Sequence, residues 1–359
     1  MLRDSDRLYL QATVELARRG MYTCTPNPRV GCIIVRDGEV LGRGWHVRAG
    51  AAHAEVNALR DAAEKDIRGA TVYVSLEPCA FEGRTPACSQ TLIKAGIARV
   101  VAAMKDPHPQ VAGGGFADLE AAGIVVDVHE LPAAAALNEG YLSRVTRKRP
   151  FVRIKVASSL DARTAMASGE SQWITGEAAR ADVQYWRARS CAVITGAGTV
   201  ASDDPKLTVR DDKFAVDGQI RQPLRVIVDS KLRTPKTAAV LQGPGASLLA
   251  HVRSARPKHK GVDHFAAGTR KVDLAALIDH LATLECNEVL VEAGPKLTGA
   301  FIEAGLWDEL IVYQAPKLLG SDARGMTELA LTRMDQAIEA TITDYAAVGD
   351  DLRIRLRPV

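Results

Sequence analysis

One histidine and two cysteines stand where they could hold a metal ion while leaving part of its coordination open. His53 is followed two residues later by Glu55, and further along come Pro78-Cys79 and then Cys88. One imidazole and two thiolates are ligands that Zn²⁺ prefers, and three protein ligands leave the fourth tetrahedral position for water. A metal in such a site lowers the pKa of its water. The pattern therefore predicts a hydrolytic zinc site with ligands His53, Cys79 and Cys88, in which Glu55 moves protons to a leaving amine.

The order of these residues is typical of zinc deaminases, whose signature is His-x-Glu followed by Pro-Cys and a second Cys, with the Glu not a ligand. Here eight residues separate the two cysteines rather than two. Two cysteines alone are more often buried thiols, but the conjunction with His-x-Glu and a strand-like segment at 71–76 is much rarer. Residues i and i+2 of a helix point about 200° apart. We therefore expect His53 and Glu55 at the first turn of a helix, with Glu55 approaching the water rather than the metal.

Length and composition limit the number of domains and the class of protein. A chain of 359 residues predicts two domains, and 47% apolar with 25% charged residues is ordinary for a soluble protein. A net charge of +3 is not the basic balance of a nucleic-acid binder. No signal peptide and no membrane span is expected, which predicts a cytoplasmic protein. The cysteines outside the metal set are expected to be small core or near-surface thiols: Cys24, Cys32, Cys191 and Cys286.

The first half reads as alternating strands and helices. An amphipathic helix is expected over 4–19, capped by Asp4 or Ser5, with Leu8, Ala12 and Leu16 on its buried stripe and Gly20 ending it. Strands are expected at 30–35, 39–45, 71–76, 99–104 and 124–128, and helices at 89–95 and 116–122. This order predicts an α/β/α domain.

Three features of the loops in this half bear on function. Asn27, between two prolines, offers an amide that could contact a heterocycle, although plain turn chemistry explains it equally well. His108, also between prolines, is expected not to bind metal because the ligand set is already complete. The segment 138–150, which holds Arg144, Arg147, Lys148 and Arg149, is interpreted either as a solvated linker or as an edge of an anionic-substrate site, and the linker is favoured.

The second half begins with a strand at 151–157 and a polar segment at 158–173 that reads as a binding loop around Trp173. A helix at 177–189 and a strand at 191–195 lead to Gly196-Ala197-Gly198, a weak match to dinucleotide-binding turns. A strand at 288–291 enters Gly294-Pro295, where a helix N-terminus could hold a phosphate. Further strands are expected at 224–230, 247–250, 310–313, 340–347 and 352–357. His251, His259 and His264 are expected to be exposed in or beside a basic loop at 253–270.

Taken together, these motifs resemble those of the bifunctional riboflavin-biosynthesis deaminase/reductase family over nearly the whole chain. The first half carries Thr25-Pro26-Asn27-Pro28, His53-Ala54-Glu55, Glu77-Pro78-Cys79 and Gly83-Arg84-Thr85-Pro86. The second half carries Ser159-Leu160-Asp161, Ser171-Gln172-Trp173, Asp203-Asp204-Pro205, Glu292-Ala293-Gly294 and Ala315-Pro316-Lys317. The wide spacing of the cysteines is that of this family. One departure is Ala80-Phe81-Glu82, where the family often has Ser-His-x, and it bears on substrate contacts rather than on the metal.

The resemblance implies an α/β fold with a cytidine-deaminase-like domain over 1–147 and a dihydrofolate-reductase-like domain over 148–359. The first would deaminate 2,5-diamino-6-ribosylamino-4(3H)-pyrimidinone 5′-phosphate with Zn²⁺, and the second would reduce the ribosyl group of the product to ribityl with NADPH. Besides Glu55, the catalytic residues would be Lys155 and Asp203. The residues near the cofactor would be Ala157, Trp173, Thr199, Asp203, Ser230 and the run Gly294, Pro295, Lys296, Leu297, Thr298, Gly299 and Ala300. Those near substrate would be Asn27, Ser171, Arg187, Leu207, Arg210 and Glu292, with Arg187 and Arg210 suited to the phosphate.

Three other interpretations compete with this one. A nucleobase or tRNA deaminase would show a basic face and more stacking aromatics than the 5% present here. A structural zinc module would close its site with a fourth Cys or His. A chain with one inactive half is disfavoured by the intact motifs in both. The family resemblance implies a phosphorylated pyrimidine substrate, no nucleic-acid or membrane partner, and a homodimer or homotetramer formed through the reductase domain.

Overall fold

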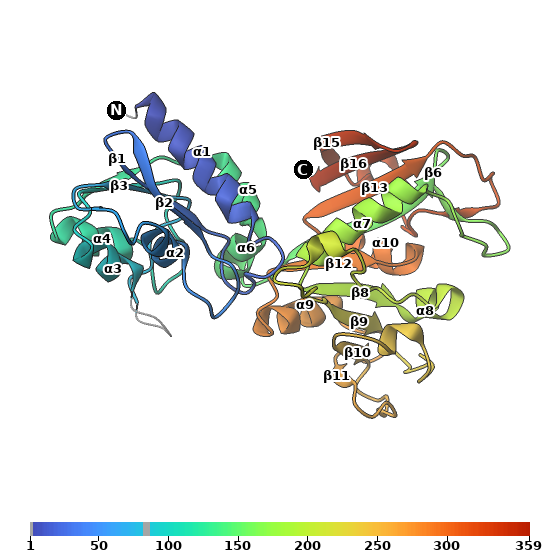
Figure 1. The fold of residues 1–359 in the computed structure, drawn as a ribbon. Helices are drawn as coiled ribbons and strands as arrows, with labels where there is room; N and C mark the ends of the chain where they lie inside the picture. Colours follow the sequence, from blue (N-terminus) through green and yellow to red (C-terminus); the bar gives the residue numbers. More distant parts are fainter. Residues whose placement is uncertain (1–2, 82–86) are drawn as a thin grey trace. The chain divides into compact units, whose positions relative to one another are not determined.

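A computed structural model of the chain describes residues 3–81 and 87–359 and divides it into two compact units (Figure 1). The first unit is Met1–Lys148 and the second is Arg149–Val359. Each has its own sheet and its own hydrophobic cores. The expected Gly83-Arg84-Thr85-Pro86 motif lies outside the described residues, as does Glu82 of the departure from the family pattern.

The first unit is built on a five-stranded sheet of order β2-β1-β3-β4-β5. β1 pairs antiparallel with β2 and β3, whereas β3, β4 and β5 run parallel. Asp37 and Gly38 join β1 to β2 with φ values of 53° and 83°, the left-handed pair that a tight hairpin turn needs. The strands are β1 (Gly31–Arg36), β2 (Glu39–Trp45), β3 (Thr71–Val74), β4 (Arg99–Ala102) and β5 (Val125–Val128).

Helices cover both faces of this sheet, which confirms the three-layer α/β/α prediction. One core packs side chains of α1 and α5 against the sheet, and the other packs those of α2, α3 and α4 against its opposite face. The helices are α1 (Asp4–Arg18), α2 (Ala54–Asp61), α3 (Cys88–Lys94), α4 (Gly114–Ala121), α5 (Pro132–Leu137) and α6 (Glu139–Arg147).

The first helix differs from its prediction in the face that it buries. Leu10, Val14 and Ala17 are buried, whereas Leu8 is 66% exposed; Leu16 alone of the expected stripe is buried. The start of the helix explains this. Asp6, rather than Asp4 or Ser5, accepts a hydrogen bond from the backbone of Arg3 and points inward, which fixes the rotation of the helix.

Gly20 is also needed for a reason other than the one expected. It does not adopt the left-handed conformation of a helix-ending glycine. A Cβ there would instead lie 2.4 Å from the carbonyl oxygen of His46 and 2.4 Å from the Cys24 sulfur. The glycine therefore permits a close approach between chain segments.

The segment 138–150 is not the solvated linker that was expected. Asn138 is buried and makes two hydrogen bonds with the backbone of Arg29, and α6 follows it directly. Arg144 donates to the carbonyl oxygen of Pro26 at 3.0 Å, and Arg149 pairs with Asp308 at 2.5 Å. The arginines thus have structural partners that a charge pattern does not reveal.

The second unit is built on a nine-stranded sheet of order β11-β10-β9-β8-β12-β6-β13-β16-β15. The strands from β11 to β13 are parallel, and the β15–β16 hairpin adds the antiparallel edge. The strands are β6 (Phe151–Ser159), β8 (Ala192–Gly196), β9 (Leu224–Val228), β10 (Ser247–His251), β11 (Asp263–Ala266), β12 (Glu288–Glu292), β13 (Glu309–Ala315), β15 (Ala340–Val348) and β16 (Asp351–Pro358). Two short strands, β7 (Arg163–Ala165) and β14 (Arg324–Gly325), pair separately.

Helices again cover both faces. α7 (Glu177–Arg189), predicted at these bounds, and α8 (Ala197–Asp203) pack on one face, whereas α9 (Leu274–Thr283) and α10 (Pro295–Glu303) pack on the other. In the middle of the sheet, fully buried Arg153 pairs with Glu288 at 2.6 Å and with Glu309 at 2.8 Å, which ties β6 to its two neighbours. No helix in the described part of the chain is long and apolar enough to span a membrane.

The prediction that three histidines of the second unit are exposed is wrong for two of them. His251 is 3% exposed and His259 is 8% exposed, while His264 is half-buried. β10 is buried along its whole length, and the loop after it folds back so that His259 donates to the carbonyl oxygen of Thr234. Local composition could not show this, because the loop is basic and polar around these positions.

Candidate active sites

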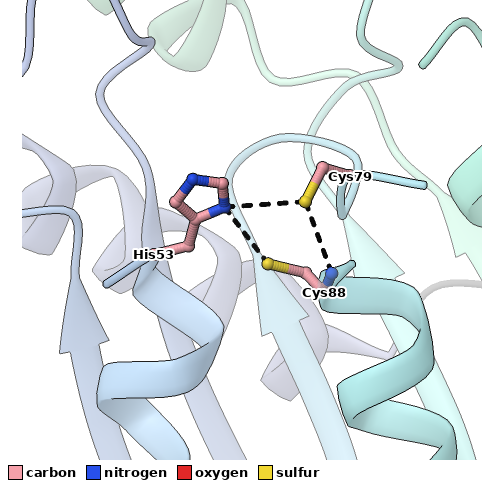
Figure 2. Close-up of side chains that lie close together, drawn as sticks. All are labelled: His53, Cys79 and Cys88. Atoms are coloured by element: carbon pink, nitrogen blue, oxygen red, sulfur yellow. Dashed lines mark hydrogen bonds between the residues drawn. The ribbon is translucent and has the colours of Figure 1, made fainter. Parts of the chain in front are cut away.

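The three expected zinc ligands come together at the end of β3. His53 is the residue that precedes α2, Cys79 follows β3, and Cys88 is the first residue of α3. His53 Nδ1 lies 3.3 Å from the Cys88 sulfur and 3.6 Å from the Cys79 sulfur, and the Cys88 amide donates to the Cys79 sulfur at 3.3 Å. Figure 2 shows the imidazole facing both sulfur atoms.

These three side chains fit a zinc ion. Their ligand atoms all lie within 4.8 Å of one another, and among the described residues no other group of three such ligands does. Separations of this size suit ligands about 2.0–2.3 Å from one tetrahedral ion. Hydrogen bonds with Cys88 first, and then with His53, lower the pKa of the Cys79 thiol and favour its thiolate, whereas the hydrogen bond with Cys79 and burial raise the pKa of the Cys88 thiol.

Glu55 lies in the first turn of α2, two residues after His53, as the spacing argument required. Its side chain is 3% exposed. Burial raises the pKa of Glu55, and the nearby Cys79 raises it further. A carboxyl whose pKa is moved towards neutrality can both accept and donate a proton, which is what general acid–base catalysis needs.

Asn27 lies near this site through a histidine that the sequence argument gave no role. The Asn27 side-chain nitrogen is 3.1 Å from His46 Nε2, and the His46 ring stands edge-on to the His53 ring at 5.3 Å between centroids. His46 is buried and its Nδ1 faces the carbonyl oxygen of Ala52 at 3.1 Å. The only signal for His46 in the sequence was its place between a strand and the His53 helix.

Glu77 holds the segment that carries Cys79. Its buried carboxylate accepts backbone hydrogen bonds from Asp106 and Gly113 at 3.1 Å and from Gly115 at 3.0 Å. Gly115 is packed so closely that a Cβ there would lie 1.8 Å from the Pro78 carbonyl oxygen. Glu77 therefore anchors the loop before α4 against the metal-binding turn, a role that the Glu-Pro-Cys motif alone does not show.

In the second unit, Lys155, Glu292 and Arg187 form one charged cluster. Lys155 on β6 is in register with Glu292, the last residue of β12, so both side chains leave the same face of the sheet. Arg187 on α7 donates from two nitrogens to the Glu292 carboxylate at 2.6 Å and 2.9 Å. Burial lowers the pKa of Lys155, while Glu292 opposes that effect.

The expected cofactor residues gather where the parallel strands end. Gly196 ends β8 in register with Val228 of β9, and Ser230 follows shortly after. The Gly294 amide, at the start of α10, donates to the Thr199 hydroxyl at 3.1 Å. No side chain caps α10, so its first backbone N–H groups can bind an anion. These features fit the phosphates of a dinucleotide. Ala157 is near the carboxyl end of β6, and therefore at the same end of the parallel strands.

The remaining expected residues lie on loops and the end of α8. Ser171 donates to Asp203 at 3.4 Å, which links the loop before α7 to α8. Trp173 is 63% exposed and stacks on Arg180 at 4.4 Å. Leu207 is buried in a left-handed conformation with φ of 52°, and Arg210 is exposed with its amide bound to Gln184. Asn27, the remaining expected substrate residue, belongs to the first unit.

Both units match known families. Residues 150–352 match the family described as RibD C-terminal domain, and residues 3–104 match the cytidine and deoxycytidylate deaminase zinc-binding region. The riboflavin biosynthesis protein RibD of Escherichia coli (strain K12) is 46% identical, with 98% of this chain and 99% of that protein covered. The protein of the same name from Haemophilus influenzae is 44% identical, with 98% and 97% covered.

Solved structures show the same likeness over the whole chain. RibD of Acinetobacter baumannii, form 2, superimposes with a TM-score of 0.92 at 44% identity, covering 99% of each chain. A diaminohydroxyphosphoribosylaminopyrimidine deaminase/5-amino-6-(5-phosphoribosylamino)uracil reductase from Thermotoga maritima does so with a TM-score of 0.89 at 31% identity, also covering 99% of each chain. These matches confirm the predicted fold class, a deaminase-like and a reductase-like α/β domain in one enzyme. The chain belongs to the RibD family, the bifunctional deaminase/reductases of riboflavin biosynthesis.

Proposed function

We propose that the first unit deaminates 2,5-diamino-6-ribosylamino-4(3H)-pyrimidinone 5′-phosphate and that the second reduces the ribosyl group of the resulting 5-amino-6-(5-phosphoribosylamino)uracil with NADPH. The observation that carries the proposal is the convergence of His53, Cys79 and Cys88 beside buried Glu55. The Lys155–Glu292 pair at the carboxyl ends of the second sheet supports the reductase half. The domain division at 147/148 is part of the same proposal.

In the deaminase site, His53, Cys79 and Cys88 would hold zinc, which supplies Lewis-acid activation of water at neutral pH. Glu55 then transfers the protons that the reaction requires. Glu55 takes a proton from the attacking water and passes it to the ring nitrogen beside C2; it then takes the proton of the new hydroxyl group and passes it to the 2-amino group, which leaves as ammonia. Burial raises the pKa of Glu55, which makes it a stronger base for these transfers. Asn27 holds the heterocycle through its amide, which His46 orients.

In the reductase site, NADPH supplies the hydride. The sugar must react in its open, imine- or aldehyde-like form, because hydride needs an electrophilic carbon. Lys155 holds a proton beside that carbon, and Glu292 opposes the lowering of the Lys155 pKa by burial. Because Arg187 is bound to Glu292, exposed Arg210 is the principal phosphate ligand in this proposal, and Arg187 acts beside it.

The other roles follow the family motifs. Asp203 serves both catalysis and cofactor binding. Its hydrogen bond with Ser171, a proposed substrate contact, supports this double role. Ser171, Leu207 and Glu292 contact substrate. The cofactor lies against Ala157, Trp173, Thr199, Asp203, Ser230 and the segment from Gly294 to Ala300.

We also propose that the protein is cytoplasmic and assembles as a homodimer or homotetramer through the reductase unit. Exposed apolar side chains on the antiparallel edge support the assembly: Ile342 is 57% exposed and Tyr345 is 74% exposed, both on β15. Sedimentation at micromolar concentration checks this, since a monomer would contradict it.

A two-reaction assay tests the function. Ammonia release from the diaminopyrimidinone phosphate and NADPH oxidation with the deaminated product are measured for wild type, Glu55→Ala and Lys155→Ala. Ammonia release should be lost only in Glu55→Ala, and NADPH oxidation only in Lys155→Ala. A zinc-loaded wild type that leaves the first substrate untouched would contradict the proposal and favour a nucleobase deaminase.

A further inference from the structure

A group of metal-ligating side chains that no step above uses lies where β9 and β10 end. Asp229 directly follows β9 and His251 ends β10; the strands' parallel register places the two side by side on the same face. The His251 and His264 rings are 5.4 Å apart, and those of His264 and His259 are 6.3 Å apart. Thr234 links His259 to Asp229: the Thr234 carbonyl oxygen accepts a hydrogen bond from His259, and the Thr234 amide and hydroxyl donate hydrogen bonds to the Asp229 carboxylate.

The hydrogen bonds of the three histidines fix where their protons are. His251 Nδ1 lies 2.9 Å from the Val252 carbonyl oxygen, and His259 Nε2 lies 2.8 Å from that of Thr234. His264 Nε2 lies 3.3 Å from the carbonyl oxygen of His259. A ring nitrogen that faces a carbonyl oxygen must be the N–H donor, so in each neutral ring the other nitrogen carries a lone pair.

All of these second nitrogens are buried and have no hydrogen-bond partner among the described residues. They are His251 Nε2, His259 Nδ1 and His264 Nδ1, and Asp229 Oδ1 shares their situation. The side chains of Asp229, His251 and His259 are 1%, 3% and 8% exposed, so bulk water does not reach them freely. Four buried acceptors without a donor are an uncommon group, because buried polar atoms are nearly always paired.

We propose that this group is a second transition-metal site, in which His251, His259, His264 and Asp229 bind a divalent ion of the Zn²⁺ class. Three imidazoles and a carboxylate are ligands suited to zinc. Each imidazole already donates its other N–H to a backbone carbonyl, the arrangement that orients metal-binding histidines. A single buried water can donate only two hydrogen bonds and would leave two of the four acceptors unpaired.

The spacing indicates that this site closes on binding. Two imidazoles on one tetrahedral zinc place their ring centres about 5 Å apart, close to the 5.4 Å between His251 and His264 and shorter than the 6.3 Å between His264 and His259. The ligand atoms are accordingly less tightly gathered than those of His53, Cys79 and Cys88. His259 lies on the loop between β10 and β11, so a movement of this loop would bring the His259 ring closer to the other ligands. We therefore expect weaker binding than at the deaminase site.

The test counts metal in the full-length protein without using activity. Chelator-treated protein is titrated with Co²⁺ and, separately, with Zn²⁺ by calorimetry. Wild type should take up two equivalents, of which only the first gives the charge-transfer absorption of cobalt bound to thiolate. A Cys79→Ala/Cys88→Ala chain should keep one equivalent without that absorption.

Matched histidine variants then identify the second site. In the cysteine-free background, His259→Gln and, independently, His264→Gln should weaken the remaining equivalent at least tenfold, while His280→Gln, a histidine of α9 outside the group, should retain it. Thermal unfolding of each metal-free variant checks that it is folded, and Zn²⁺ should raise the unfolding temperature of the His280→Gln chain only. One equivalent in wild type, or full second-site binding by the His259 and His264 variants, overturns the proposal.

Discussion

His46 fixes the direction of the Asn27 amide. Because His46 Nδ1 faces the carbonyl oxygen of Ala52, that nitrogen carries the ring proton and Nε2 is an acceptor. Asn27 must therefore turn its NH₂ group towards His46, 3.1 Å away. Its carbonyl oxygen is left for a hydrogen-bond donor, such as an amino group or ring N–H of a pyrimidine.

Replacing His46 by Leu should therefore impair substrate binding rather than the metal. We expect KM for deamination to rise about tenfold, the value of one oriented hydrogen bond, with kcat and zinc content nearly unchanged. His46→Gln should recover part of the loss because its amide can donate to Ala52 and accept from Asn27. Steady-state ammonia release and metal analysis provide the measurement, and an equal loss in both variants with lower zinc content would count against this role.

Gly115→Ala should damage the zinc site from a distance. The new Cβ would lie 1.8 Å from the Pro78 carbonyl oxygen, and the displaced turn carries Cys79. We expect zinc affinity to fall about 10–100-fold, as for other residues that orient metal ligands, while NADPH oxidation by the second unit is retained. Gly114→Ala is the control, because its Cβ meets only the Ala80 Cβ, at 3.2 Å. Equal zinc affinity in the two variants would be the contrary result.

The reductase reaction should lose activity at high pH earlier than an ordinary lysine would allow. Burial lowers the pKa of Lys155, so its proton is lost at a lower pH than the usual value of about 10.4. Glu292 opposes that shift, so Glu292→Gln should move the alkaline loss of kcat to still lower pH. A pH profile of NADPH oxidation measures both effects. An alkaline limb that does not move in Glu292→Gln would exclude Lys155 as its source.

The Asp6–Arg99 pair should stabilise the first unit in a pH-dependent way. Arg99 binds the buried Asp6 carboxylate at 2.9 Å and 3.0 Å, and Tyr73 donates to it at 2.6 Å. Arg99 first, together with Tyr73, holds the pKa of Asp6 well below its usual value. The stabilisation is therefore present above about pH 4 and is lost as pH falls towards the lowered pKa.

Asp6→Asn should accordingly lower the free energy of unfolding by about 3 kcal/mol at neutral pH, and the gap from wild type should narrow below about pH 4. Denaturant unfolding of the full chain at several pH values measures this. Asp127→Asn is the control: Asp127 contacts the same arginine but is 38% exposed, so its loss should cost at most about 1 kcal/mol. A gap that stays constant with pH would refute the assignment.

Much of the fold could be read from the sequence because periodicity and turn residues act locally. The hairpin at Asp37-Gly38 and the helix over 177–189 are such cases. The buried face of α1 could not, since it depends on Asp6 reaching Arg99, a residue far along the chain. The linker interpretation of segment 138–150 is wrong for the same reason: Arg144 and Arg149 bind carbonyl and carboxylate groups that are distant in the sequence.

The zinc ligands were predictable because three residue types and their spacing suffice to specify them. The residues that hold these ligands in place could not be predicted. Glu77 acts through backbone amides of the loop before α4, and backbone amides have no sequence signature. The burial of His259 could not be predicted because it depends on the loop after β10 folding back onto Thr234.

The strand order of the second sheet has a consequence during protein synthesis. β16 lies between β13 and β15, and Arg355 on β16 binds Glu309 of β13. β16 is also the last of these strands to leave the ribosome, so the nascent reductase unit exposes an unpaired edge of β13 until then. The deaminase unit, complete at Lys148, can fold roughly 10–40 s earlier at usual elongation rates. Newly made chains thus pass through a stage in which the deaminase unit is folded while the reductase unit still presents an unpaired strand edge, a template for pairing with other chains.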